Sequence, residues 1–178
     1  MINGINSREM ILEILLEIEE GEHSHVAIRN ALSKYQFLPK QDRAFITRVC
    51  EGTLEYRIQI DYIINSFSKV TVDKMKPAIR EILRSAVYQL KYMDSVPDSA
   101  VCNEAVKLAQ RKGFYNLKPF VNGVLRTIAR EMDQVRFPQK EDDLLKYLSV
   151  KYSMPEVLVT RWLEAYGEET TEKILADF

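Results

Sequence analysis

The sequence predicts an all-α fold. Its 178 residues include only six glycines and six prolines and are rich in Leu, Ile, Glu, Lys, Arg and Ala, which favours helices over sheets. Apolar residues recur at helical spacing along most of the chain, and Gly or Pro stands at most of the expected helix ends. We therefore expect about ten helices and no strands.

The first part of the chain is expected to form helices over residues 6–20, 24–34 and 39–67. Asn6 and Glu9 stand at the spacing of a capping box, and Gly21 is placed to end the first helix. Pro39 suits the first turn of the third helix. Gly52 lies inside that long helix and indicates close packing or a kink.

The remaining helices are expected over residues 98–112, 141–152 and 155–166, and from Pro77, Pro119 and Thr170 onward. Three of them should end at turns or glycines, at residues 94–97, Gly113 and Gly167. Ser153 is a possible N-cap for the helix that Pro155 opens. Gly123 would let a neighbouring helix approach closely.

The composition describes an ordinary globular protein. Cys50 and Cys102 both fall inside helical patterns, which argues against a disulfide framework and for a reducing cytoplasm. The N-terminus lacks the pattern of a secretory signal, and no apolar run is long enough to cross a bilayer, so we expect no membrane partner.

Signals for catalysis are weak. The sequence holds no glycine-rich phosphate loop, nucleophile elbow or zinc-protease motif. We interpret His23 and His25 as loop histidines, the two cysteines as buried core thiols, and the stripe of Glu9, Glu13 and Glu17 as a solvated helix face. No catalytic, cofactor-binding or metal-binding residue is assigned within this chain.

The distribution of charge is uneven. Residues 1–22 hold one basic and six acidic residues, and residues 141–178 hold four basic and nine acidic ones. Residues 105–130 hold six basic residues and no acidic one. Seven residues there are candidates for RNA contact: Lys107, Arg111, Lys112, Lys118, Asn122, Arg126 and Arg130.

An ordinary solvated surface would explain the same pattern, and the charges alone favour neither interpretation. Asn122, Arg126 and Arg130 repeat every four residues and so share a helix face. Four aromatic residues could stack on unpaired bases or belong to the core: Tyr88, Tyr92, Phe114 and Tyr115. Phe114 and Tyr115, in the loop after Gly113, are the best candidates for exposure.

Several motifs then resemble a known family. They are Asp42-Arg43-Ala44-Phe45, Gly52-Thr53-Leu54, Leu83, Tyr88-Gln89-Leu90, Val96-Pro97, Asn103-Glu104-Ala105-Val106 and Phe120-Val121-Asn122-Gly123-Val124-Leu125-Arg126. Over roughly residues 7–132 the chain resembles the NusB-like RNA-binding domain, in the form fused to rRNA (cytosine-5) methyltransferases of the RsmB, Sun or Fmu type. The resemblance implies two packed small helical bundles with a short C-terminal helical appendage.

The resemblance also implies a function. Residues 1–136 would form a domain that positions small-subunit rRNA for S-adenosylmethionine-dependent cytosine-5 methylation. Residues 137–178, beginning at Phe137-Pro138-Gln139, would form a helical linker subdomain leading to the methyltransferase domain. Such an enzyme needs a Pro-Cys nucleophile, and neither cysteine here follows a proline, so we expect a fragment that is not catalytic by itself.

Two alternatives stay open. One is a free-standing NusB-type transcription antitermination factor, which would pair with a small ribosomal-protein-like partner. The other is a helical protein-interaction module that binds no RNA. NusB factors tend to carry arginines early in their first helix, whereas here only Arg8 is present among glutamates, so the resemblance favours the 105–130 region for RNA contact.

Overall fold

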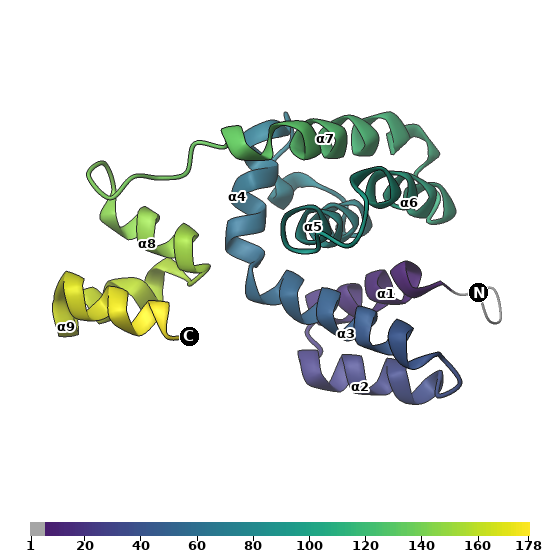
Figure 1. The fold of residues 1–178 in the computed structure, drawn as a ribbon, viewed down its shortest axis with the longest axis horizontal. Helices are drawn as coiled ribbons and strands as arrows, with labels where there is room; N and C mark the ends of the chain where they lie inside the picture. The colour runs from purple at the N-terminus through teal and green to yellow at the C-terminus, as the bar shows by residue number, and fades with distance from the viewer. Residues whose placement is uncertain (1–5) are drawn as a thin grey trace.

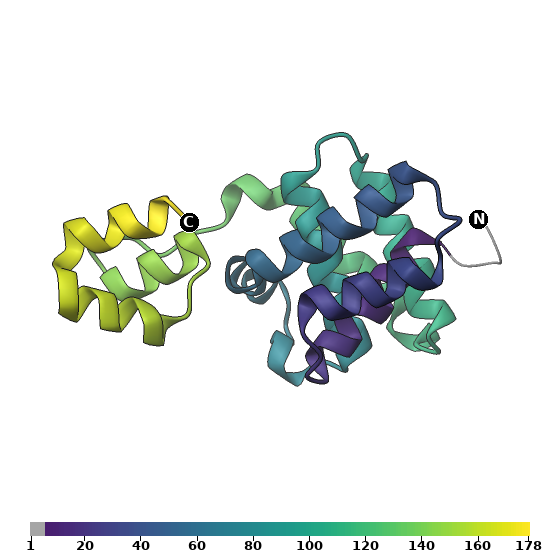
Figure 2. The same cartoon turned by 90° about the horizontal axis from the view of Figure 1, so that it is seen from below.

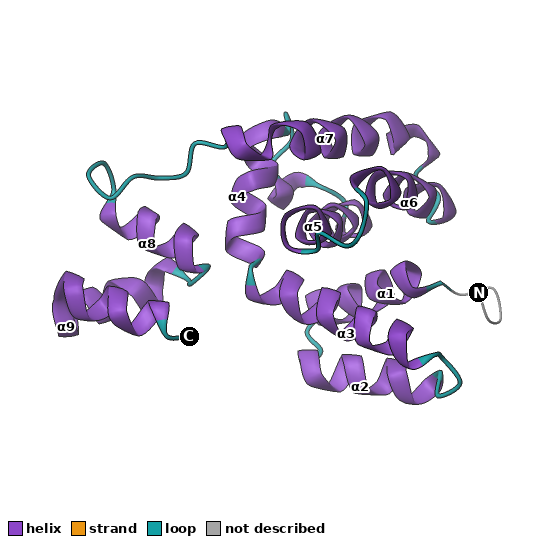
Figure 3. Ribbon diagram, viewed as in Figure 1, coloured by secondary structure: helices purple, strands orange, loops and turns teal. Residues whose placement is uncertain are grey.

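The computed structural model of the protein describes residues 6–178, and within that range Figure 3 shows helices and loops but no strand. The prediction of an all-α fold is confirmed. Nine α-helices lie in this range: α1 (Ser7–Glu19), α2 (Ser24–Lys34), α3 (Lys40–Glu55), α4 (Arg57–Phe67), α5 (Pro77–Tyr92), α6 (Asp98–Arg111), α7 (Lys118–Glu131), α8 (Leu144–Tyr152) and α9 (Glu156–Ala176). Three short 3-10 helices accompany them: η1 (Val72–Lys74), η2 (Tyr115–Leu117) and η3 (Met132–Gln134).

Local signals located the ends of the first helices correctly. The side-chain oxygen of Asn6 accepts a hydrogen bond of 2.8 Å from the backbone N–H of Glu9, so Asn6 is the N-cap of α1. The chain leaves α1 through Gly21, whose φ of 120° is open to glycine and strained for other residues. The second helix has the predicted bounds.

The expected single helix over residues 39–67 is wrong, because the chain breaks at Tyr56 into α3 and α4. Tyr56 leaves the helical conformation, and its ring stacks on that of Tyr92 with the centroids 4.5 Å apart. The break changes the direction of the chain, as Figure 1 shows. It allows α3 to pack on α1 and α5 while α4 packs on α5, α7 and α8.

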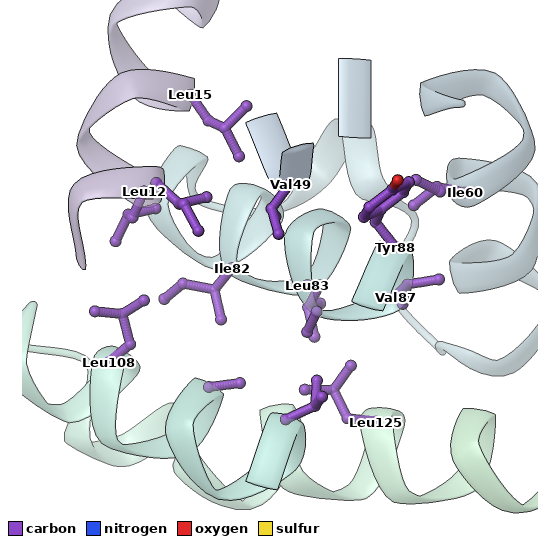
Figure 4. Packing of buried hydrophobic residues seen from close by; sticks show 14 of the residues in the cluster. Leu12, Leu15, Val49, Ile60, Ile82, Leu83, Val87, Tyr88, Leu108 and Leu125 are labelled. Atoms are coloured by element: carbon purple, nitrogen blue, oxygen red, sulfur yellow. The ribbon is translucent and has the colours of Figure 1, made fainter. Parts of the chain in front are cut away.

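Helix α5 lies at the centre of the larger core. It contacts α1, α3, α4, α6 and α7, which explains why nine of its sixteen residues are buried, including the polar Glu81, Ser85 and Gln89. Figure 4 shows Ile82, Leu83 and Val87 of α5 among side chains from the surrounding helices. One continuous hydrophobic cluster thus includes residues of all the helices from α1 to α7.

The two interior glycines behave differently. A Cβ atom at Gly52 would overlap the ring of Tyr88, so the close packing expected there is confirmed. Nothing lies within 4 Å of the position a Cβ would take at Gly123, so the expected helix approach there is wrong. Gly123 is exposed because it lies on the outward side of α7.

Helices α8 and α9 form a second, smaller cluster around Leu148, Val159 and Leu175. Figures 1 and 2 show this pair beside α4, joined to α7 by an extended connection. Gly167, with a φ of 78°, interrupts α9 where the sequence predicted a helix end. Among the helices of residues 6–178, none is long and apolar enough to cross a membrane.

Two expectations for this part of the chain need correction. Helix α8 begins at Leu144 rather than residue 141, because the Asp143 side chain accepts a hydrogen bond of 3.0 Å from the N–H of Lys146 and so caps the helix. Ser153 does not cap α9. It ends α8 in the left-handed conformation, with a φ of 53°.

Candidate nucleic-acid interface

Helices α6 and α7 pack side by side and are joined by a short connection that contains η2 (Figure 1). Gly113 allows the sharp turn after α6, with a φ of 88°. The antiparallel arrangement brings the polar faces of the two helices together, because a short connection favours packing side by side.

Arg126 is the centre of this shared face. Its Nη2 atom donates a hydrogen bond of 2.7 Å to the side-chain oxygen of Asn103 on α6. Its Nε atom donates one of 3.1 Å to the side-chain oxygen of Asn122, one turn earlier on α7. The two amides therefore hold the guanidinium group across the seam between the helices.

Lys118 makes a second bridge across the seam. Its ammonium group donates a hydrogen bond of 2.9 Å to the side-chain oxygen of Gln110 on α6. The same group lies 4.6 Å from the centroid of the Tyr115 ring, within the range of a cation–π contact. A cation and an aromatic ring thus lie together at this end of the face.

Lys107 and Arg130 lie on the same face, and both side chains are largely exposed to solvent. Their side chains are 62% and 69% exposed, and within residues 6–178 they pair only with sequence neighbours, at 3.5 Å to Glu104 and 3.7 Å to Glu131. Exposed ion pairs of this kind contribute little energy and are easily exchanged for another anion. We call this surface the basic row; it consists of Asn103, Lys107, Gln110, Tyr115, Lys118, Asn122, Arg126 and Arg130.

Arg111 and Lys112 are placed differently from the other predicted cations, because they face α1. Arg111 lies 3.7 Å from a carboxylate oxygen of Glu9, and Lys112 lies 3.6 Å from Glu9 and also pairs closely with Glu13. The hydrogen bond to Glu13 is the main cause that raises the pKa of Lys112. The stripe is therefore not a purely solvated face: Glu13 is exposed but paired with Lys112, and Glu9 is partly buried between Arg111 and Lys112.

Of the four aromatic candidates for base stacking, only Tyr115 is largely exposed, with 64% of its surface accessible to solvent. Tyr88 is buried, and Phe114 packs against the main core. The ring of Tyr92 is covered by that of Tyr56.

Arg8 lies on the side of α1 that faces α5, whereas an arginine that binds RNA would face solvent. Its guanidinium group donates two hydrogen bonds, of 3.1 and 3.2 Å, to the side-chain oxygen of Gln89. It also lies 5.2 Å from the ring centroid of Phe45, and burial lowers its pKa. This arrangement agrees with placing the candidate interface on α6 and α7.

Sequence reasoning missed Asn103 and Gln110, because neither carries a charge. A signal was nevertheless present. Asn103, Lys107 and Gln110 follow one another at intervals of four and three residues, which places them on one face of a helix.

Other candidate chemistry finds no support in the geometry of residues 6–178. Burial raises the pKa of both thiols, at Cys50 and Cys102, and so disfavours a nucleophilic thiolate. No group of three or more His, Cys, Asp or Glu side chains in this range is arranged to hold a metal ion. His23 and His25 are both exposed, but only His23 lies in the loop, since His25 belongs to the first turn of α2.

Comparison with known proteins gives a consistent result. A model of the NusB family matches residues 5–130. The chain is 35% identical over 167 residues to a probable ribosomal RNA small subunit methyltransferase B of Bacillus subtilis, a match that covers 94% of this chain and 37% of that protein. It is 33% identical over 130 residues to the transcription antitermination protein NusB of Dictyoglomus thermophilum, covering 72% of this chain and 85% of the relative.

Solved structures share the fold. A structure of antitermination factors NusB and NusE in complex with dsRNA matches with a TM-score of 0.64 and 21% identity, over 70% of this chain and 93% of the matched chain. The structure of PH0851 matches with a TM-score of 0.72 and 21% identity, over 97% of this chain and 38% of the other. The chain thus spans well under half the length of the methyltransferase relative and of PH0851.

Proposed function

The chain belongs to the NusB family, and from that premise we propose that it binds RNA through the basic row on α6 and α7. One observation carries the proposal: two cations of α7, Lys118 and Arg126, are oriented by neutral amides, and two of the three amides come from α6. Side chains held in this way contact phosphates with little further loss of conformational freedom. Arg111 and Lys112 would contribute by exchanging the α1 carboxylates for phosphate groups.

We propose small-subunit rRNA as the RNA. The protein would then be part of an enzyme that methylates cytosine at C5 with S-adenosylmethionine. Residues 1–136 would bind the RNA, and residues 137–178 would lead to a catalytic domain that holds the cofactor and the nucleophilic cysteine. The alignment with the Bacillus subtilis methyltransferase, over 94% of the chain, supports this assignment.

A free-standing antitermination factor is the second candidate. The Dictyoglomus NusB protein supports it, because it is nearly as similar in sequence, but that match covers only 72% of the chain. The methyltransferase relatives align over 94% and 98% of the chain, a difference that favours the methyltransferase assignment.

Binding of small-subunit rRNA fragments, measured against salt concentration, tests the proposal. For single-stranded RNA the logarithm of affinity should fall with the logarithm of salt concentration by about 0.7 per contacted phosphate. Joint reversal of Arg126→Glu and Arg130→Glu should flatten this slope by about 1.4. The pair Arg161→Glu and Lys173→Glu, exposed on α9, changes the net charge equally and is the matched control.

Equal flattening by the control pair would remove the basic row as the binding site. Absence of RNA binding by the unmodified protein would contradict the proposed function and favour a protein-interaction module. Equal affinity for unrelated RNA of the same length would remove the assignment to rRNA.

A further inference from the structure

The break between α3 and α4 creates a helix N-terminus at the place where α8 ends (Figure 1). The first N–H groups of a helix have no partners within the helix and need acceptors from elsewhere. Tyr56, at the N-cap of α4, provides no side-chain hydrogen bond. The acceptor comes from a distant part of the chain.

Ser153 supplies it. Its hydroxyl oxygen accepts a hydrogen bond of 3.3 Å from the backbone N–H of Gln59, the third residue of α4. Ser153 is 9% exposed and holds the left-handed conformation that ends α8. The residue that ends α8 therefore also caps α4.

Gln59 returns the interaction. Its side-chain amide donates hydrogen bonds of 3.3 and 3.4 Å to the carbonyl oxygens of Lys151 and Val150, in the last turn of α8. Its side-chain oxygen accepts a hydrogen bond from the hydroxyl of Tyr92. The positive end of the α4 dipole thus meets the negative end of the α8 dipole, with both ends capped by the same two residues.

A second contact lies one turn along the same face of α4. The hydroxyl of Tyr62 donates a hydrogen bond of 2.6 Å to the carbonyl oxygen of Arg136, where the connection to α8 begins. The ring of Phe137 stacks on that of Tyr62, with the centroids 5.7 Å apart. Because Gln59 and Tyr62 are three residues apart, both anchors lie on one side of the helix.

Helices α8 and α9 depend on this attachment for a defined position. Their own core contains three buried hydrophobic residues, Leu148, Val159 and Leu175. A unit of this size rarely holds a fixed structure by its own core. The two anchors therefore decide where the unit sits relative to α4, and through α4 relative to α7.

We propose that Gln59 and Ser153 are positioning residues, which hold the α8–α9 unit in one orientation relative to the basic row. Residues 137–178 then act as a rigid arm, so that a domain following α9 meets the bound RNA at one distance. This consequence for RNA rests on the proposed function, whereas the fixed orientation itself does not require RNA.

Distances between spin labels test the arm directly. Ser99→Cys on α6 and Glu169→Cys on α9 place labels at exposed positions of the two parts, while the native thiols of Cys50 and Cys102 are buried. The labelled parent protein should give a single narrow distance distribution. Adding Gln59→Leu and Ser153→Gly to the labelled protein should broaden the distribution, because together they remove both caps. Leucine at position 59 retains the side-chain size, and glycine at position 153 retains the left-handed backbone.

Ser66→Ala is the matched control, because that hydroxyl also lies on α4 but bonds within its own helix, to Tyr62 at 2.8 Å. It should leave the distribution narrow.

Trypsin should cleave the combined variant after Arg136 or Lys140 roughly tenfold faster than the parent, the factor expected when about 1.4 kcal/mol of local stability is lost. RNA affinity should change less than about twofold, which also shows that the larger core remains folded.

A broad distribution in the parent protein, or a narrow one in the combined variant, would overturn the inference. Loss of RNA binding in the combined variant would also overturn it, because the two residues would then support the whole fold. If the parent binds no RNA but gives the expected distances, the proposed function fails and the rigid arm stands.

Discussion

The guanidinium group of Arg126 on α7 donates a hydrogen bond of 2.7 Å to the side-chain oxygen of Asn103 on α6. This bond joins the two helices that carry the basic row. It also fixes the direction of a flexible side chain before any ligand binds. Removing the bond would therefore change the preorganisation of Arg126 without changing its charge.

Asn103→Ala should weaken RNA binding without changing its salt dependence. The substitution frees Arg126 but removes no charge, so the expected loss is about 0.5–1.5 kcal/mol, the cost of ordering one long side chain. Affinity measured at several salt concentrations should give parallel lines for the variant and the parent. A change in slope would show instead that a phosphate contact had been lost.

Glu13→Gln should strengthen RNA binding, because it removes the closer of the two carboxylates on α1 that pair with Lys112. An exposed ion pair contributes about 0.5–1 kcal/mol, so the gain should be about two- to fivefold. Glu17→Gln is the control, since it makes the same charge change on the same helix and Glu17 forms no ion pair with the other residues of 6–178. Equal gains from both variants would exclude a specific role for the Lys112 pair.

Tyr115→Ala should reduce binding to single-stranded RNA by about 1–3 kcal/mol if its exposed ring stacks on a base. Tyr115→Phe should retain most of the affinity, because stacking requires the ring and not the hydroxyl. Phe37→Ala, at an exposed aromatic residue of the loop after α2, should have no effect. Binding isotherms for the three variants distinguish these outcomes, and full affinity in Tyr115→Ala would exclude stacking.

Gly52→Ala should destabilise the protein by about 1–3 kcal/mol, because the added methyl group overlaps the Tyr88 ring. Tyr88→Leu removes the ring and leaves a cavity, so it should also destabilise the protein when made alone. The double variant should be more stable than the sum of the two changes predicts. Additive losses in urea unfolding would show that the two residues do not interact.

Stability should decline in alkaline solution partly through Cys50, whose thiol pKa is raised by burial. Below the ordinary thiol pKa, about 8.5, the group is protonated in both states and contributes no pH dependence. Above it, the unfolded chain loses the proton while the folded protein keeps it, so unfolding becomes more favourable.

The expected loss from this thiol is about 2 kcal/mol between roughly pH 8 and pH 10. Cys50→Ala should lose that much less stability over the same interval, as measured by urea unfolding at the two pH values. Identical declines in the variant and the parent would show that Cys50 does not cause the effect.

Helix ends show how far local sequence determines this fold. Asn6, Gly21, Gly113 and Gly167 mark ends that the sequence predicted correctly. They do so because capping and left-handed backbone depend on the residue itself and its immediate neighbours. The break at Tyr56 has no such local signal, and the contact found there, the stacking of its ring on that of Tyr92 of α5, is distant in sequence.

The same division holds for the surface. The four-residue spacing of Asn122, Arg126 and Arg130 was sufficient to predict that they share one face of a helix, because helical periodicity is a local property. Whether each cation is available was decided by contacts distant in sequence: Arg126 lies against Asn103, whereas Lys112 pairs with Glu13, 99 residues away. The sequence alone thus determined most of the helices and the location of their charges. The tertiary packing decided where α3 gives way to α4, which charges remain open and how α8 meets α4, because all three depend on side chains that only folding brings together.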